Sequence, residues 1–252
     1  MSDKHLFALY AHKISENVLV KPGKQIVIAD EALWHRVVHV LHLQADEEIV
    51  LFDGKVSVQL RLAAAPKKGT ITGIVQSRED VIPLQPEITL YQSVLKREAF
   101  GDVAYYAAQM GVTAFVPVLT HKAHRGWGGE KEKERLRSVM ISACEQSKQY
   151  ALPEICDAIE FSALAQKTWD RASTISIYCD PAGKPLLEVL QSVASSQGKS
   201  INVFIGPEGG FTQTEVDQLV QNGATGCALT PSILRSQDAA VLSLGAIRSV
   251  AR

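Results

Sequence analysis

Three glycines within five residues mark the stretch of this chain best suited to hold a ligand against bare backbone. The stretch reads FIGPEGGFTQTE, residues 204–215, and its glycines are Gly206, Gly209 and Gly210. Glycine is most useful where the chain adopts a positive φ or where another group must approach the main chain closely. No lysine or arginine lies between Gly206 and the end of the helix that follows, so the phosphate-binding pattern G-x-x-x-x-G-K-[ST] is absent. The sequence therefore favours a ligand of little net charge, held by main-chain amides and carbonyls.

A helix is expected to begin directly after these glycines. Thr212 and Glu215 have the spacing of a capping box, in which the hydroxyl and the carboxylate satisfy free amides of the first turn. Gly223 is placed to end that helix. These residues are thus explained by helix structure alone.

A second segment, LTPSILRSQDAAVLSL, could form the opposite wall of such a site. A strand ends there, Pro231 breaks it, Ile233 and Leu234 offer apolar contact, and Arg235 precedes an alanine-rich helix. Arg235 can equally be a solvated or capping charge, and the two apolar residues can equally belong to the core.

Basic side chains gather in a third region, residues 111–154. It includes Lys122, Arg125 and Lys148. The helix expected from residue 131 opens with KEKERLR, whose charges are mixed in sign and predict a solvated face.

The helices and strands that must position these segments show two different sequence patterns, with a domain boundary expected between them near residues 75–85. Before it, short β-type runs separated by turn signals predict a small barrel or sandwich. Beyond it, apolar strands alternate with helices, which predicts a mostly parallel sheet covered on both faces. The first part has strands expected at 24–30, 47–54 and 56–65, with a helix between the first two that places Leu33, Val37, Val40 and Leu41 at helical spacing. The second part has strands expected at 88–95, 114–119, 174–179, 202–206 and 226–230, and helices at about 99–110, 131–149, 184–196, 213–222 and 236–250. Ligands of parallel sheets bind beyond the carboxyl ends of the strands, where the glycine stretch is expected.

Composition limits the class of protein. The chain has 252 residues, 46% of them apolar and 21% charged, with a formal net charge of −1. These values are typical of a globular domain or two, and no basic excess advertises a nucleic-acid partner. No apolar run of membrane-spanning length and no secretory signal is evident, which favours the cytoplasm. The four cysteines are far apart and form no metal-ligand cluster, so we expect reduced thiols and no metal.

Taken together, these segments resemble the ribosomal RNA small-subunit methyltransferase E family of the SPOUT superfamily. The resemblance extends in register over nearly the whole chain. It is carried by IGPEGGFTQTE (205–215), ILR (233–235), ACEQS (143–147) with LPE (152–154), GVTAFVPVLT (111–120) and LWHRVVHVLHL through LFDG (33–54). The chain departs from the usual family pattern at His42, Tyr106, Gln109, Gln149, Thr230, Ser232 and Gln237.

The resemblance implies both a fold and an activity. The fold is an α/β SPOUT methyltransferase domain with a C-terminal trefoil knot, residues 76–252, after a PUA-like RNA-binding β-barrel, residues 1–75. The activity is methylation of N3 of a uridine in 16S ribosomal RNA with S-adenosylmethionine, by a homodimer acting on free RNA or on the assembled small subunit. The cofactor would be held by Ile205, Gly206, Pro207, Gly209, Gly210, Leu229, Pro231, Ile233 and Leu234.

The implied chemistry assigns the remaining residues. Arg235 is expected to stabilise the uracil anion that attacks the methyl group, while Glu208 is expected to act either as a base or as a scaffold of its loop. Phosphate contacts are expected from Lys96, Arg97, Lys122, Arg125 and Lys148. Two alternatives stay open: a knotted RNA-binding protein with lost or redirected activity, and a hydrolase using Glu208 as its base.

Overall fold

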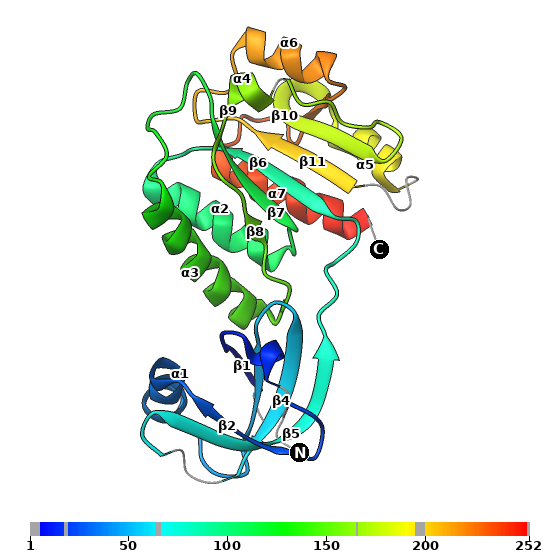
Figure 1. Ribbon diagram of the computed structural model, residues 1–252. Coiled ribbons are helices and arrows are strands. Elements are labelled where there is room, and N and C mark those ends of the chain that lie inside the picture. The colour runs from blue at the N-terminus through cyan, green and yellow to red at the C-terminus, as the bar shows by residue number, and fades with distance from the viewer. Residues whose placement is uncertain (1–5, 18–19, 64–66, 165, 195–199, 251–252) are drawn as a thin grey trace. The chain divides into compact units, whose positions relative to one another are not determined.

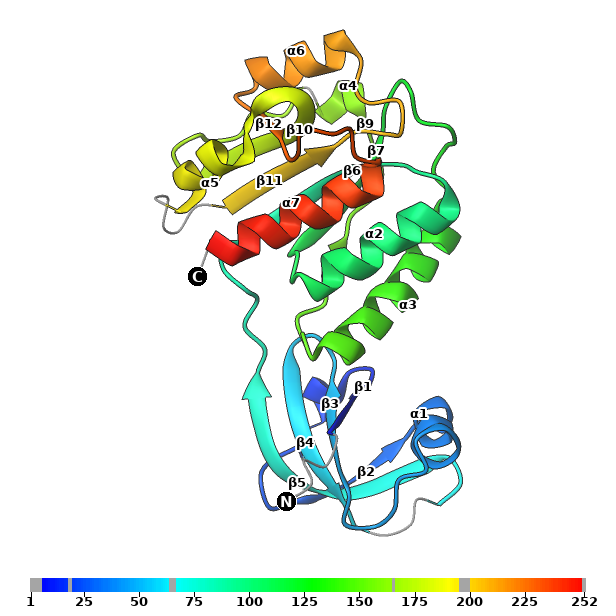
Figure 2. The ribbon, with the colours of Figure 1, turned by 180° about the vertical axis from the view of Figure 1, so that it is seen from behind.

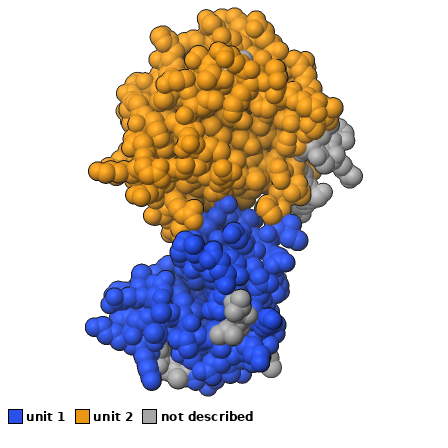
Figure 3. All heavy atoms as spheres, in the orientation of Figure 1, with its two compact units in different colours: residues 1–82, 144–152 blue, residues 83–143, 153–252 orange. Residues whose placement is uncertain are grey.

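The structure, a computed structural model, describes residues 6–17, 20–63, 67–164, 166–194 and 200–250. The chain forms two compact units, one of Met1–Ile82 with Cys144–Leu152 and one of Pro83–Ala143 with Pro153–Arg252 (Figure 3). No helix within the described residues is both long and apolar enough to cross a membrane.

The first unit is built on a five-stranded sheet in the order β1-β3-β4-β5-β2. Its strands are β1 (Phe7–Tyr10), β2 (Gln25–Ala29), β3 (Glu48–Phe52), β4 (Val56–Leu62) and β5 (Thr70–Asp80). β1 pairs with β3 in parallel and the other neighbours are antiparallel. The strands expected at 24–30, 47–54 and 56–65 are confirmed, although residues 64–66 lie outside the described residues. β1 and β5 were not expected, and β5 runs through the position predicted for the domain boundary.

The helical segment of this unit is shorter and less regular than its sequence pattern predicts. A short turn of 3₁₀ helix, η1 (Ile14–Glu16), precedes β2, and α1 (Glu31–His35) leads into a π-helical turn, η2 (Arg36–Val40). Leu33 and Val37 are buried as expected, but Val40 is 58% exposed. The wider turn, closed by Leu41 N–H donating to the Arg36 carbonyl, turns Val40 away from the core.

The second unit contains a seven-stranded sheet whose described neighbours are all parallel. The order is β12-β10-β11-β6-β7-β8, and β9 also pairs with β7. The strands are β6 (Ile88–Ser93), β7 (Ala114–Leu119), β8 (Glu154–Ile155), β9 (Ile159–Glu160), β10 (Thr174–Pro185), β11 (Ser200–Ile205) and β12 (Thr225–Ala228). The predicted mostly parallel sheet is confirmed.

Helices cover both faces of this sheet (Figures 1 and 2). They are α2 (Arg97–Gln109), α3 (Glu130–Ser147), α4 (Phe161–Leu164), α5 (Leu186–Ala194), α6 (Gln213–Gln221) and α7 (Ser236–Val250). On one face, α4 and α6 pack Phe161 and Leu219 into a cluster with Tyr91 and Phe204 of the sheet. On the other, α7 packs against α2 and β11.

Arg248 fixes the last turn of α7. Its guanidinium donates to the carbonyls of Met110, Pro86 and Gly111 at 2.9, 2.8 and 2.7 Å, and burial lowers its pKa to about 10. With this end fastened, the first turn of α7 is held beside the carboxyl end of β11.

Candidate functional site

The glycine stretch forms a tight loop at the carboxyl end of β11. Gly210 has φ +66°, a conformation that L side chains rarely adopt, and its N–H donates to the Pro207 carbonyl at 2.9 Å. A Cβ on Gly206 would lie 3.1 Å from the backbone nitrogen of Phe211. The backbone conformation at Gly210 and the close approach at Gly206 therefore favour glycine at both positions, before any ligand is considered.

The capping box predicted after the loop is confirmed. Glu215 N–H donates to Thr212 Oγ1 at 3.2 Å, and Glu215 Oε2 accepts from Thr212 N–H at 2.7 Å. The other carboxylate oxygen, Oε1, accepts from the backbone N–H of His121 at 2.9 Å. This buried carboxylate thus also fastens the segment after β7 to the start of α6.

Lys122 braces the same loop from the outside. Its Nζ donates to the carbonyls of Gly209 and Phe211 at 3.0 and 3.2 Å. A Cβ on Gly209 would lie 3.3 Å from Lys122 Cδ, so the absence of a side chain lets the lysine stem lie against the loop. The ammonium group expected to contact phosphate is therefore used within the protein.

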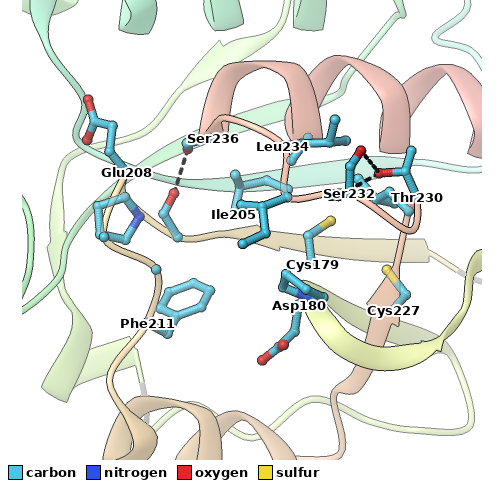
Figure 4. A pocket seen from close by; sticks show the side chains of 18 residues that line it. Cys179, Asp180, Ile205, Glu208, Phe211, Cys227, Thr230, Ser232, Leu234 and Ser236 are labelled. Atoms are coloured by element: carbon cyan, nitrogen blue, oxygen red, sulfur yellow. Dashed lines mark hydrogen bonds between the residues drawn. The ribbon is translucent and has the colours of Figure 1, made fainter.

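The segment after β12 lies opposite the glycine loop and is tied to it. Ser236 Oγ donates to the Gly206 carbonyl at 2.5 Å and accepts from Nε2 of Gln92 at 3.1 Å. Within the second segment, Thr230 Oγ1 donates to the Ser232 carbonyl at 2.7 Å. The two segments singled out in the sequence, 30 positions apart at Gly206 and Ser236, thus meet at the carboxyl edge of the sheet (Figure 4).

Between the two segments is a cleft of about 270 Å³ (Figure 4). Eight of the nine residues expected to hold a cofactor line it: Ile205, Gly206, Pro207, Gly209, Gly210, Leu229, Ile233 and Leu234. Pro231 is not among the lining residues, although Thr230 and Ser232 on either side of it are.

Sequence reasoning missed the contribution of β10 to this cleft. Cys179, Asp180 and Pro181 line it, as does Cys227 of the neighbouring strand β12. Cys179 and Cys227 are paired in register, and the hydrogen bond between them, together with burial, raises the pKa of Cys179. Cys179 is therefore a neutral thiol near pH 7 and contributes contact rather than charge. The available signal was positional: residues 179–181 lie at the end of the strand expected at 174–179, as the glycine stretch lies at the end of the strand expected at 202–206.

The electrostatics of the cleft favour a cationic or neutral ligand. Its lining includes two carboxylates, those of Asp180 and Glu208, and no lysine or arginine. Apolar contact comes from Ile205, Leu229 and Leu234, and bare backbone comes from the glycines. No group of three or more metal-ligating side chains is found in the described part of the chain. The arrangement suits a molecule with a positive charge, a flat apolar body and groups that bond to main chain.

The two residues expected to take part in chemistry lie at the edge of the cleft. Glu208 lines it but is exposed, and Figure 4 shows its carboxylate directed away from Asp180 and Cys179. Arg235 is exposed and lies between two lining residues, Leu234 and Ser236, without lining the cleft itself.

Of the five basic residues expected to contact RNA, Arg97 and Arg125 line one hollow of the second unit, and the other three are not among its lining residues. Lys96 and Arg97 are exposed at the start of α2, and Lys148 follows α3 in the first unit with φ +57°. Arg125 is engaged by Glu132, to which it donates two hydrogen bonds of 2.6 and 2.7 Å.

Comparison with known proteins agrees with this geometry. Residues 83–248 match the family model of an RNA methyltransferase domain. The ribosomal RNA small subunit methyltransferase E of Mycobacterium bovis is 26% identical over 82% of this chain and 80% of its own, and that of Rickettsia conorii is 25% identical over 94% and 95%. The structure of the Neisseria gonorrhoeae protein of that name, bound to S-adenosyl methionine, superposes with a TM-score of 0.81 at 24% identity, over 97% of this chain and 98% of that one.

These findings confirm the resemblance drawn from the sequence. The matched family model covers the second unit, including both walls of the cleft, and the curated relatives extend over most of the chain. This chain belongs to the RNA methyltransferase domain family.

Proposed function

We propose that this protein methylates N3 of a uridine in small-subunit ribosomal RNA, with S-adenosylmethionine as the methyl donor. The observation that carries the proposal is the cleft between the two segments, which combines bare backbone, apolar contact and two carboxylates without a cation. A sulfonium-bearing nucleoside has the complementary chemistry: a positive charge, a flat base, and polar groups that main chain can bond. The curated relatives are named as methyltransferases of small-subunit ribosomal RNA, which supports this class of substrate and reaction.

The residues around the cleft fit this cofactor. We assign its binding to Ile205, Gly206, Pro207, Gly209 and Gly210 on one wall, and to Leu229, Ile233 and Leu234 on the other. Pro231 would act by bending the second wall. Cys179 and Asp180 join the site from β10, where the Asp180 carboxylate can accept hydrogen bonds from a hydroxyl or balance a positive charge.

The reaction requires that N3 lose its proton and attack in line. S-adenosylmethionine, when bound, supplies a methyl group on a positively charged sulfur. The pKa of uracil N3 lies well above neutrality, so a nearby cation that stabilises its anion aids the attack. We assign this role to Arg235, and its exposed position beside two residues that line the cleft supports the assignment. Glu208 is better suited to shaping its loop than to taking the proton, because its carboxylate is directed outwards (Figure 4).

Further features of the proposal concern the architecture and its setting. We propose that the first unit is a PUA-like RNA-binding barrel, and that the walls of the cleft belong to a trefoil knot. In support of the knot, the chain leaves β11, passes β10 to form β12 at the sheet edge, and returns to place α7 against β11.

A homodimer acting in the cytoplasm on free RNA or assembled subunits completes the proposal. Exposed apolar side chains on α2 and α7, Tyr106 and Leu242, support a partner surface.

The test is transfer of labelled methyl groups to small subunits that lack their native methylation. The purified protein is incubated with these subunits and radiolabelled S-adenosylmethionine, and the product nucleoside is identified by mass spectrometry. We expect 3-methyluridine at a single position. Calorimetric binding of the cofactor without any transfer would instead identify an RNA-binding protein that has lost the reaction, and a different methylated nucleoside would contradict the proposed target.

A further inference from the structure

A second hollow, separate from the cofactor cleft, lies between the first turns of α2 and α3. Its volume is about 330 Å³, and it is lined by Arg97, Arg125, Gly128, Lys131, Glu132 and Arg135. The lining contains four cations and one carboxylate. The sequence pattern KEKERLR predicted only a solvated face of mixed charge here, whereas the fold joins its Lys131 and Arg135 to two cations from other segments, Arg97 and Arg125. Figures 1 and 2 both show α2 and α3 lying side by side.

The single carboxylate of the hollow is committed to two of the four cations. Arg125 donates to both oxygens of Glu132, at 2.6 and 2.7 Å, and Arg135 lies 3.6 Å from the same carboxylate. Burial alone would raise the pKa of Glu132, but hydrogen bonds from Arg125 and Gly128 lower it, so Glu132 is ionised near pH 7. Arg125 and Glu132 thus form an ion pair without net charge in the wall of the hollow.

The other cations keep unused hydrogen-bonding capacity. Across the described residues, the side chains of Arg97 and Lys131 make no hydrogen bond or ion pair, and both are exposed. Arg135 donates to the Arg97 carbonyl at 3.2 Å, but its Nε is buried without a hydrogen-bond partner in that same part of the chain. The Arg135 side chain is 24% exposed, so part of its guanidinium can still donate to an oxygen-rich ligand in the hollow.

The surrounding backbone adds to the positive potential. Arg97 is the first residue of α2 and Lys131 the second of α3, helices of 13 and 18 residues whose amino-terminal dipoles favour an anion. Guanidinium groups match the paired oxygens of a phosphate. The exposed carboxylates nearest in sequence, Glu98 and Glu130, do not line the hollow.

We infer that this hollow binds a backbone phosphate of the substrate RNA through Arg97, Lys131 and Arg135. The inference rests on the proposed function, because it takes RNA rather than another polyanion as the ligand. Arg97 keeps the phosphate contact expected from the sequence, while Arg125 is reassigned to hold Glu132 and shape the site.

The test is the salt dependence of RNA binding by the full chain. The probe is a fluorescein-labelled single-stranded oligoribonucleotide containing uridine, and the variant is Arg97→Ala with Lys131→Ala, two exposed positions whose loss leaves the core intact. Each lost phosphate contact lowers the slope of log Kd against log salt by about 0.7, so loss of the single phosphate held in the hollow should lower the slope of the double variant by about 0.7 and weaken binding by about tenfold at low salt. The matched control is Lys167→Ala with Lys184→Ala, which removes the same charge from exposed positions away from the hollow.

The control variant should keep the wild-type slope. A wild-type slope in the Arg97/Lys131 variant, or an equal fall in the control, would overturn the inference. Calorimetry with S-adenosylmethionine tests the proposed function separately, and both variants should bind the cofactor as the wild type does. A wild-type protein that fails to bind the cofactor would contradict the proposed function. The phosphate site would still be tested by the salt slopes.

Discussion

Replacing Ser236 by alanine tests whether the two walls of the cleft are held together as the structure shows. The Ser236 hydroxyl donates to the Gly206 carbonyl at 2.5 Å and accepts from Gln92 Nε2 at 3.1 Å. Ser236 is 7% exposed and Gln92 is fully buried, so water is poorly placed to replace either bond. The substitution therefore removes the side-chain link between the glycine loop and the first turn of α7 while leaving the backbone of both segments in place.

The size of the effect follows from the bonds that are lost. A hydrogen bond contributes about 1 kcal/mol net, and a buried group left without a partner costs somewhat more, so two lost bonds predict a fall of about 2 kcal/mol in the free energy of unfolding. The loss of stability is increased at Gln92, because its Oε1 already has no hydrogen-bond partner among the described groups and the substitution removes one of the bonds that its Nε2 makes. Cofactor binding is also weakened, because in the variant part of the binding free energy is spent on ordering the loop. We therefore expect the Kd for S-adenosylmethionine to rise about tenfold, or about 1.4 kcal/mol.

The assays are urea unfolding and calorimetric titration with S-adenosylmethionine. Ser236→Thr is the matched control, because it keeps the hydroxyl and should retain most of the affinity. Wild-type stability together with wild-type affinity in Ser236→Ala would refute the claim that this hydroxyl joins the walls. Equal losses in the alanine and threonine variants would show that shape, not the hydroxyl, matters.

Three further substitutions test other parts of the account. Arg235→Ala should abolish methyl transfer while leaving cofactor affinity within about tenfold, or ~1.4 kcal/mol; single-turnover assays beside calorimetry measure both, and unchanged turnover would remove Arg235 from the reaction. Lys122→Met keeps an apolar stem but loses both hydrogen bonds to the glycine loop, so the cofactor Kd should rise by about threefold, or ~0.7 kcal/mol; a fall in RNA affinity alone would return Lys122 to the phosphate contacts. Glu132 has a lowered pKa in the folded protein, so its contribution to stability is present above the unfolded pKa of about 4.3 and is lost as the pH falls through the folded value. Glu132→Gln should therefore lower the free energy of unfolding at pH 7 and make it fall less steeply as the pH is lowered, as measured by urea unfolding at a series of pH values. If the variant loses stability in acid as steeply as the wild type does, the role of the Arg125–Glu132 pair is contradicted.

The sequence was most informative where a pattern is local. The parallel sheet, the capping box at Thr212 and Glu215, and both walls of the cleft follow from periodicity, caps and glycines that can be read within a few residues. β5 was missed although its buried residues alternate, because the charged residues at its end resemble a linker. The π-helical turn at Arg36–Val40 could not be predicted from the sequence, because one wider turn changes the direction in which Val40 points without any change in amino-acid composition.

What the sequence could not provide is the set of contacts between distant segments. Lys122 reaches a loop 87 positions away, and Ser236 bonds to Gln92 across 144 positions. Neither pairing has a periodic or spacing signature. The same holds for Arg97 and Lys131, whose charges look solvated until α2 and α3 are placed side by side. Local patterns thus identified the residues that line the cleft, and only the fold showed which side chains support them.

The most direct test of the central claim is hydrogen–deuterium exchange of the full chain with and without saturating S-adenosylmethionine. If the cofactor is held between the glycine loop and the segment after β12, amide exchange should slow in residues 205–211 and in residues 227–236 together, with a smaller effect at residues 179–181 of β10. Cofactor binding, confirmed by calorimetry, that slows exchange elsewhere while leaving both of these segments unchanged would contradict it.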